Sequence, residues 1–155
     1  LLLSWSEWAR DESRFGPEPL DTGFRASDLG DALRRGRAPV KNALMDQSRV
    51  AGVGNIYASE ALHRARIDPT RPVSDLTDDE IRRLHRSLRH ILRSSLGSSG
   101  TTFRDDRAVN GRSGSFQTLL RAYGREGESC TNCGHLIHRI VQGGRSTYYC
   151  PGCQH

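Results

Sequence analysis

Apolar residues recur with the period of an α-helix in the second third of the chain. The clearest run is 78–95, whose face is formed by Ile81, Leu84, Leu88, Ile91 and Leu92, with Leu96 following in the same register. Thr77 and Glu80 stand just where this run begins, at the spacing of a capping box, in which each side chain bonds the backbone amide of the other residue. We therefore predict a helix from Asp78 to about Ser95.

Three shorter segments before this helix show weaker helical patterns. The first is predicted from Ala26 to Arg35, with Ser27 as its cap and Gly36 as its end. The second is predicted to begin at Pro39, because proline is favoured in the first turn of a helix, and to end near Asp46. The third is predicted from Asn55 to about Ala65. The pattern as a whole indicates a mainly α protein.

The last part of the chain has the pattern of a β-hairpin. Residues 136–141 and 146–149 are rich in β-branched and aromatic side chains, and Gly143-Gly144 lies between them. A glycine pair is typical of a tight turn that joins two antiparallel strands. The sequence therefore predicts a small hairpin after the helical region.

Four cysteines enclose this hairpin in two C-x-x-C pairs, Cys130 with Cys133 and Cys150 with Cys153, separated by 16 residues. Four thiolates at this spacing are the ligand set of one tetrahedral Zn²⁺, as in a zinc ribbon. The hairpin is too small to form a core, so a metal is expected to fix its fold. Two disulfides are the alternative, but the chain shows no secretory segment, which favours zinc. His135 and His138 are substitute ligands that four cysteines make unnecessary.

The charge balance favours a polyanionic partner. The chain carries 23 Lys and Arg residues against 18 Asp and Glu residues, a net charge of +5. All of the basic residues except Lys41 are arginine, which suggests that this position needs a compact ammonium group. No apolar run is long enough to cross a bilayer, and we expect no membrane partner.

Gly52-Val-Gly54 stands directly before the third predicted helix. Glycines let a backbone come close to a ligand, and the first amides of a helix favour an anion, so this turn and Asn55 form a candidate phosphate site. Lys41 lies one short helix upstream, and Arg145 lies at the tip of the hairpin, where a guanidinium can bind phosphate oxygens. The alternatives are a plain tight turn and a solvated arginine. The adjacent pairs Asp78-Asp79 and Asp105-Asp106 are better explained as solvated turns than as carboxylates for hydrolysis, and the sequence has no Ser/His/Asp arrangement or phosphate-binding P-loop.

Several of these segments together resemble one known family. The run Lys41-Asn-Ala-Leu-Met-Asp-Gln47, with Val50-Ala-Gly-Val-Gly-Asn-Ile-Tyr-Ala-Ser-Glu-Ala-Leu62, resembles the helix-two-turn-helix motif of formamidopyrimidine-DNA glycosylases and their endonuclease VIII relatives. The resemblance extends over 100–105, 114–117, 123–125 and the zinc hairpin at 144–154, and 15–20 resembles the interdomain linker of the family.

The resemblance implies a role for each candidate residue. Lys41 and Asn55, with the turn of Gly52 and Gly54, would contact the phosphates on either side of a damaged nucleotide. Arg145 would reach the same backbone from the hairpin. The loop at about 103–115 would close over the everted base, and the four cysteines would bind one structural zinc ion.

The resemblance also implies a domain organisation. Residues 1–23 would be the end of an amino-terminal catalytic domain with its linker, and 1–8 a remnant strand of that β-rich domain. A helix-two-turn-helix domain would occupy 24–120 and the zinc finger 121–155. The expected partner is double-stranded DNA with damaged bases or abasic sites. We expect a monomer in the bacterial cytoplasm, associated with the nucleoid when it is bound to DNA.

The implied activity is that of a bifunctional DNA glycosylase and AP lyase that removes oxidised purines, namely 8-oxoguanine and formamidopyrimidines. The family uses an amino-terminal proline and a following glutamate, which nothing in this sequence matches, so we expect these 155 residues alone to bind DNA without excising a base. Asp106 and Ser115 depart from the family pattern and leave oxidised pyrimidines as a second class of substrate. Two competing hypotheses are a stand-alone zinc-containing DNA-binding module and a lyase that uses Lys41 as its amine.

Overall fold

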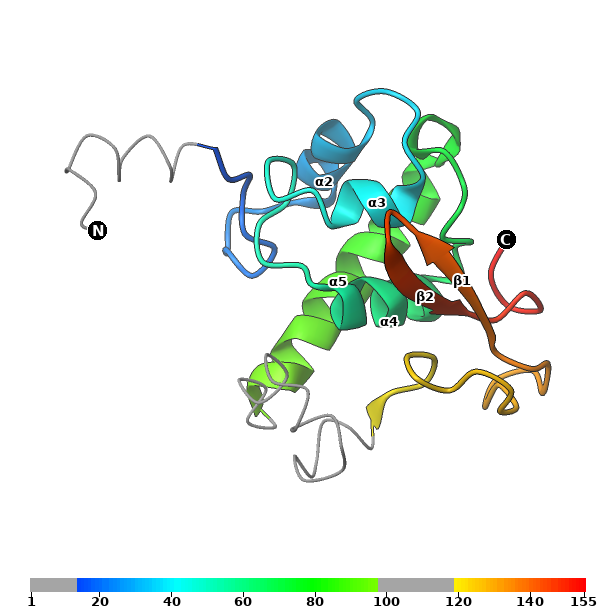
Figure 1. Ribbon diagram of the computed structural model, residues 1–155. Helices are drawn as coiled ribbons and strands as arrows, with labels where there is room; N and C mark the ends of the chain where they lie inside the picture. Colours follow the sequence, from blue (N-terminus) through cyan, green and yellow to red (C-terminus); the bar gives the residue numbers. More distant parts are fainter. Residues whose placement is uncertain (1–13, 98–118) are drawn as a thin grey trace, which may run out of the picture.

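The computed structural model describes residues 14–97 and 119–155, which form a helical part and a β-hairpin (Figure 1). In chain order the elements are α2 (Ala26–Leu33), α3 (Val40–Leu44), α4 (Asn55–Ala65), the 3-10 helix η1 (Val73–Asp75), α5 (Asp78–Gly97), β1 (His138–Gln142) and β2 (Arg145–Tyr149). The architecture is mainly α with a small β ribbon, as the sequence predicted. The strand predicted at 1–8 and the loop at 103–115 lie outside the described residues.

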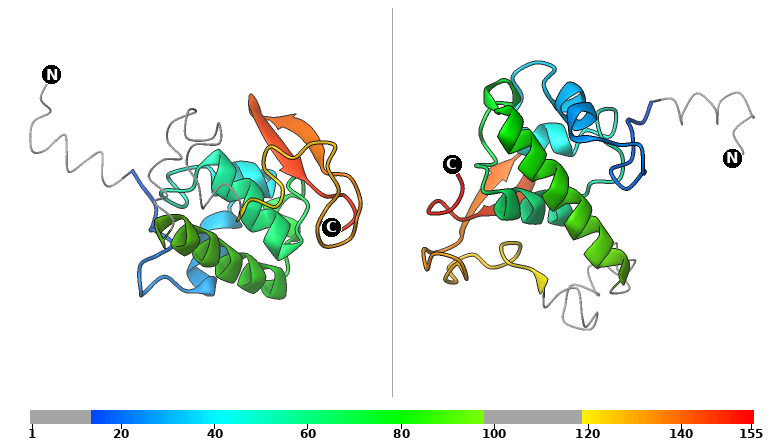
Figure 2. Two further views of the ribbon diagram at one scale, coloured as in Figure 1. Left: turned by 90° about the horizontal axis from the view of Figure 1, so that it is seen from below. Right: turned by 180° about the vertical axis from the view of Figure 1, so that it is seen from behind.

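Helix α4 lies at the centre of the molecule. It packs against α5 on one side and against β2 on the other, and Figures 1 and 2 show the hairpin and α5 on opposite faces. Apart from Phe24 the buried core around it is aliphatic, and its fully buried members include Leu29, Leu33, Leu44, Leu62, Ile67, Leu84 and Leu88. Because each such side chain stabilises the fold by about 1.5–3 kcal/mol when it leaves water, this core fixes the position of α4.

Helix α5 forms for the reason that its sequence predicts. The Thr77 hydroxyl accepts the Glu80 amide at 3.1 Å, and the Glu80 carboxylate accepts the Thr77 amide at 2.9 Å, which completes the capping box. Glu80 also forms an ion pair with Arg71. Hydrogen bonding to Arg71 lowers the pKa of Glu80 to about 2. The periodic face packs inward, with Ile81 and Leu84 among its buried residues.

Helix α2 is shorter than predicted, and Ser27 is not its cap. The helix ends at Leu33, two residues before the predicted end, and Gly36 follows in the left-handed region at φ 88°. Its N-cap is Arg25, whose amide donates to the Asp28 carboxylate at 2.8 Å. The side-chain acceptor at this end of the helix is therefore the Asp28 carboxylate, which binds the N-cap amide, and not the hydroxyl of Ser27.

The turn between α3 and α4 is closed by side chains and covered by the preceding linker. The Gln47 side-chain carbonyl accepts the amide of Gly52, whose φ of 83° favours glycine. On the linker, Gly16 donates its amide to the Gln47 backbone carbonyl at 2.8 Å, and Pro17 accepts the amide of Ala51 at 3.0 Å. A Cβ atom on Gly16 would lie 2.2 Å from the carbonyl oxygen of Arg49, so only glycine allows this approach.

The hairpin has a two-residue turn with the predicted glycines. Gln142 pairs with Arg145, and φ values of 56° at Gly143 and 79° at Gly144 are those of a type I′ turn. Strand β1 begins at His138 rather than at residue 136. The reason is that Ile137 exchanges backbone hydrogen bonds of 2.9 Å with 127–128, so the first part of the predicted strand pairs with an earlier segment.

The hairpin is attached to the helical part by polar contacts near α4. The Gln142 side chain donates to the carbonyl of Pro69 at 3.1 Å, and near the end of the chain the buried Gln154 joins Cys150 to Ile67.

Within the described residues, no helix is long and apolar enough to cross a bilayer.

Candidate metal centre and nucleic-acid interface

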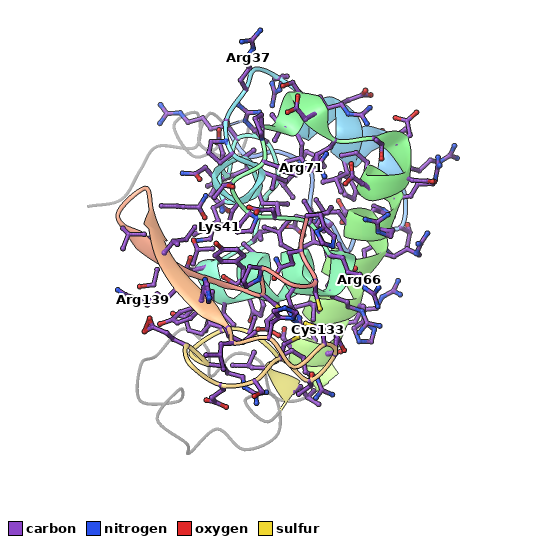
Figure 3. All side chains as sticks on the ribbon, turned by 90° about the vertical axis from the view of Figure 1, so that its right-hand side faces the viewer. Arg37, Lys41, Arg66, Arg71, Cys133 and Arg139 are labelled. Atoms are coloured by element: carbon purple, nitrogen blue, oxygen red, sulfur yellow. The ribbon has the colours of Figure 1, made fainter. Side chains whose placement is uncertain are left out.

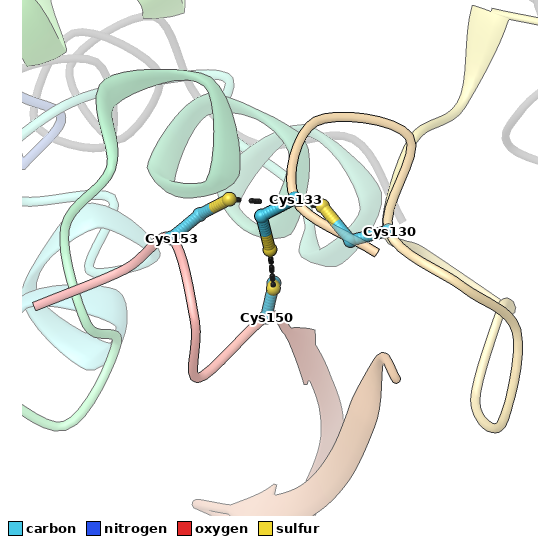
Figure 4. A group of neighbouring side chains, drawn as sticks. All are labelled: Cys130, Cys133, Cys150 and Cys153. Atoms are coloured by element: carbon cyan, nitrogen blue, oxygen red, sulfur yellow. Dashed lines mark hydrogen bonds between the residues drawn. The ribbon is translucent and has the colours of Figure 1, made fainter. Parts of the chain in front are cut away.

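The four cysteines converge on one point (Figure 4). Their sulfur atoms all lie within 4.8 Å of one another, with 3.4 Å between Cys133 and Cys150 and 3.7 Å between Cys130 and Cys153. Zn–S bonds of about 2.3 Å in a tetrahedron place sulfurs about 3.8 Å apart, so the cluster has the size of a zinc site. All four thiols are free of disulfides. These residues hold one structural zinc ion, as the sequence predicted.

Neither candidate histidine replaces a cysteine in this cluster. His138 lies on β1 and makes an edge contact with the ring of Tyr149. His135 places its Nδ1 3.4 Å from the sulfur of Cys133, as a neighbour of a ligand rather than as a member of the cluster. Gly152 lies against this pair, since a Cβ atom there would be 2.4 Å from His135 Nδ1.

Lys41, the one lysine in the chain, is buried, with only 1% of its surface exposed. Its ammonium donates a hydrogen bond to the side-chain oxygen of Asn55. Burial, and secondarily the positive charge of Arg145, lowers the pKa of Lys41 to about 8. Among the residues that the structure describes, no carboxylate lies within ion-pair distance of Lys41. The burial of this amine is therefore not offset by a carboxylate.

Asn55 connects three elements instead of capping a helix. The N-cap of α4 is Gly54, and Asn55 is the first residue of the helix. Its side-chain oxygen accepts from Lys41, while its side-chain amide donates to the carbonyl of Ser146 on β2 at 2.9 Å. The Asn55 side chain therefore joins α3, α4 and β2.

A hollow of about 360 Å³ lies between the hairpin tip and the start of α4. It is lined by Lys41, Asn42, Met45, Gln47, Val53, Gly54, Gln142, Gly143 and Arg145. Two of these residues, Lys41 and Arg145, are cations, and no carboxylate among the described residues lines the hollow. Its electrostatics therefore favour an anion. Figure 3 shows Lys41 in the interior between hairpin and helices, whereas Arg37 projects outward.

The structure thus brings most of the predicted phosphate residues together, although they come from three separate segments. Lys41, Gly54 and Arg145 line the hollow, and Asn55 holds Lys41. Gly52 does not line it, and its amide is occupied by Gln47. The role of Gly52 in this structure is to allow the turn, not to present a free amide.

Sequence reasoning missed a buried carboxylate on α4. The two Glu60 oxygens accept the backbone amides of Arg121, Ala122 and Tyr123 at 2.7, 2.8 and 2.7 Å. These bonds fix the segment that enters the zinc finger against α4. The only signal in the sequence is a glutamate among small and apolar residues of a helix, Ala58, Ala61 and Leu62 among them.

His63, one turn further along α4, was also missed. It is buried, and its Nε2 lies 3.5 Å from the sulfur of Cys130. Nothing in the local sequence relates the two, because 67 positions separate them.

The chain matches two family models. The model described as "Formamidopyrimidine-DNA glycosylase H2TH domain" matches residues 15–106, and the one described as "Zinc finger found in FPG and IleRS" matches 127–155. Together they cover the helical part and the hairpin.

Curated relatives are similar to the chain over nearly its whole length. It is 49% identical over 142 residues to the formamidopyrimidine-DNA glycosylase of Desulfitobacterium hafniense, a match covering 92% of this chain and 52% of the relative. It is 46% identical over 153 residues to that of Zymomonas mobilis, covering 99% and 55%. The chain thus spans about half the length of the curated relatives it matches.

Solved structures show the same fold. The MutM (Fpg) protein of Thermus thermophilus is 45% identical with a TM-score of 0.82, and the match covers 91% of this chain and 54% of that one. A complex of Lactococcus lactis Fpg with abasic-site DNA is 34% identical with a TM-score of 0.84, covering 98% and 56%.

Proposed function

This chain belongs to the formamidopyrimidine-DNA glycosylase family, and from that premise we propose that it is the part of a base-excision-repair enzyme that holds damaged DNA around a flipped nucleotide. The observation that carries the proposal is the convergence of Lys41 and Arg145 at one anion-favouring hollow, where Asn55 accepts a hydrogen bond from Lys41. The complex of the Lactococcus lactis relative with abasic-site DNA supports the same class of partner.

A DNA phosphate supplies what the hollow lacks, namely a negative charge beside Lys41. The lysine is held in the interior by Asn55, so its side chain needs no further ordering when DNA binds. A phosphate at this position stabilises the protonated amine and so raises the pKa of Lys41 from its value of about 8 in the free chain. Gly54, the N-cap of α4, lines the hollow, and the positive end of the helix dipole favours an anion there.

Arg145 reaches this phosphate from the other side of the hollow. It is exposed beside the hairpin turn, and none of the described carboxylates pairs with it. Its planar guanidinium can bind two phosphate oxygens at once. Contacts of this kind fix the position of a duplex without reading its sequence, and they hold the backbone while a base leaves the stack.

The activity of the whole protein is also a proposal. We infer a DNA glycosylase with AP lyase activity that removes oxidised purines, namely 8-oxoguanine and formamidopyrimidines, and acts as a cytoplasmic monomer. The proposed division is a catalytic remnant and linker at 1–23, a helix-two-turn-helix domain at 24–120 and a zinc finger at 121–155. Because no residue of these 155 matches the family's proline and glutamate, this polypeptide alone is expected to bind and not to excise.

Titration of the chain onto duplex DNA tests the proposal. A duplex with an abasic-site analogue is compared with an undamaged duplex at two salt concentrations, and excision is measured on DNA containing 8-oxoguanine. We expect binding that weakens as salt rises, with preference for the abasic duplex, and no excision. Binding that salt leaves unchanged would contradict the phosphate site. Excision by the pure chain would contradict the assignment as a binding part only.

The lowered pKa of Lys41 favours a second candidate, in which its amine attacks abasic sugar as a lyase. Burial of the side chain and its bond to Asn55 oppose this role. Borohydride reduction on abasic DNA separates the two. A covalent adduct that disappears in Lys41→Arg would support the lyase, and the absence of an adduct would leave Lys41 as a binding residue.

A further inference from the structure

His63 brings a side chain of α4 into contact with the cysteine cluster. Only 2% of its surface is exposed, and its Nε2 lies 3.5 Å from the sulfur of Cys130, which is 3% exposed. The packing of apolar residues does not explain why a buried imidazole from α4 lies beside a metal-binding sulfur of the zinc finger.

The chemistry of the zinc site gives this contact a purpose. Four thiolates around one Zn²⁺ leave a doubly negative formal charge, and three of the four cysteines are buried. Such charge needs hydrogen-bond donors near the three buried sulfurs, because water does not reach them readily. Cys130 already has the Asn132 amide at 3.4 Å, and the His63 ring is placed to supply a second donor.

We propose that His63 is a positioning residue for the zinc centre. The Nε2–H of His63 donates a hydrogen bond to the Cys130 thiolate, and this bond slows the loss of the metal. In this arrangement the helical part of the chain supplies an outer contact to a zinc finger whose own ligands lie at 130–153. The tautomer that the proposal requires is the neutral ring with its proton on Nε2.

The surrounding contacts hold His63 in place. Asn55, at the start of the same helix, bonds Ser146 of β2, and Glu60 bonds the three amides at 121–123 that lead toward Cys130. Helix α4 is therefore attached to the hairpin on one side and to the segment before the first ligand on the other. A histidine on so constrained a helix keeps its distance to Cys130.

His135 offers an internal comparison. Its Nδ1 lies 3.4 Å from the sulfur of Cys133, but both residues are exposed. Water can replace a donor that is lost at this sulfur, whereas it cannot reach Cys130 as readily. The same substitution should therefore have a smaller effect at His135 than at His63.

The test uses the zinc-loaded chain and measures the rate at which zinc passes to a chelating dye. His63→Phe, His63→Gln and His135→Gln are compared with the parent chain, and His90→Gln, an exposed histidine on α5, is the control. We expect zinc loss about 10- to 100-fold faster in His63→Phe, partial rescue in His63→Gln, whose amide can donate, and little change in the other two.

The Co²⁺-substituted chain gives a readout that separates hydrogen bonding from packing. Loss of an N–H···S bond raises the energy of the sulfur electrons, so the thiolate-to-cobalt absorption band should move to longer wavelength in His63→Phe and less in His63→Gln. An unchanged band together with an unchanged rate of zinc loss in His63→Phe would overturn the proposal. If His63→Phe does not fold, equal rates and spectra in His63→Ala and His63→Gln would overturn it.

Discussion

The Lys41 ammonium donates to the side-chain oxygen of Asn55, 14 residues further along the chain. Because Asn55 also donates to Ser146, this pair joins the two helices of the motif to the zinc hairpin. The zinc site and the anion hollow are therefore parts of one arrangement, in which the metal fixes the hairpin, and the hairpin completes the hollow with Arg145.

Burial of Lys41 makes the stability of the chain depend on pH in a defined window. Its pKa is about 8 in the folded chain and returns to the ordinary value of 10.5 on unfolding. Between these values the unfolded chain binds more protons, so the free energy of unfolding rises with pH. At neutral pH the buried charge costs about 3 kcal/mol, a cost that is fully present below the folded pKa and disappears as pH rises through 10.5.

Chemical denaturation of the parent chain and of Lys41→Met at neutral pH and near the upper end of this window checks the prediction. Since Met has no charge, the parent chain should gain stability relative to the variant as pH rises. Other titrating groups are common to both and cancel in the difference. If the difference in the free energy of unfolding between the two chains stays constant with pH, burial does not disfavour the charged form of Lys41.

Glu60→Gln should destabilise the contact between α4 and the segment before the zinc finger. A glutamine presents one acceptor and one donor group where three backbone amides require acceptors. We expect a loss of about 1–3 kcal/mol in the free energy of unfolding, and faster hydrogen exchange at residues 121–123. Glu126→Gln, at an exposed position, is the matched control and should change neither quantity.

Gly16→Ala should displace the linker from the turn between α3 and α4, because the new Cβ atom would lie 2.2 Å from the Arg49 carbonyl oxygen. We expect a loss of about 1–3 kcal/mol, as for other cases of overpacking. Gly23→Ala is the control, since a Cβ atom there meets nothing within 4 Å. Equal thermal stability of the two variants would mean that the linker does not pack as described.

Removal of zinc with a chelator should unfold the hairpin and leave most of the helical part, α2 to α5, folded. The buried hairpin cluster contains Ile137 and three of the cysteines, whereas α2–α5 share a separate aliphatic core. We expect circular dichroism to retain most of the helical signal while DNA binding is lost, and both to recover when zinc is restored. Retention of DNA binding by the zinc-free chain would show that the hollow binds DNA without the folded hairpin, contrary to this prediction.

Much of this fold follows from local sequence. The capping box at Thr77 and Glu80 and the apolar period after it predict α5, because both depend on residues within a few positions of one another. The cysteine spacing and the glycine pair predict the zinc hairpin for the same reason. Resemblance to the family then assigned Lys41, Asn55 and Arg145 to one region.

The parts that sequence could not predict depend on residues far apart in the chain. The contacts of Glu60 and of His63 each cross more than 60 positions, and the close approach of Gly16 to Arg49 depends on how the linker folds back. The start of β1 was misplaced because Ile137 pairs with 127–128 instead of β2. Strand-forming composition does not identify the partner of a strand.

The most direct test of the central claim, that a DNA phosphate binds beside Lys41, is the salt dependence of duplex binding in Lys41→Met and the parent chain. A lost phosphate contact should weaken binding to all sequences and reduce the slope of log K against log salt by about 1. Arg93→Met, at an exposed position of α5, is the control and should keep the parent slope. A Lys41→Met chain with both the affinity and the slope of the parent would contradict the account.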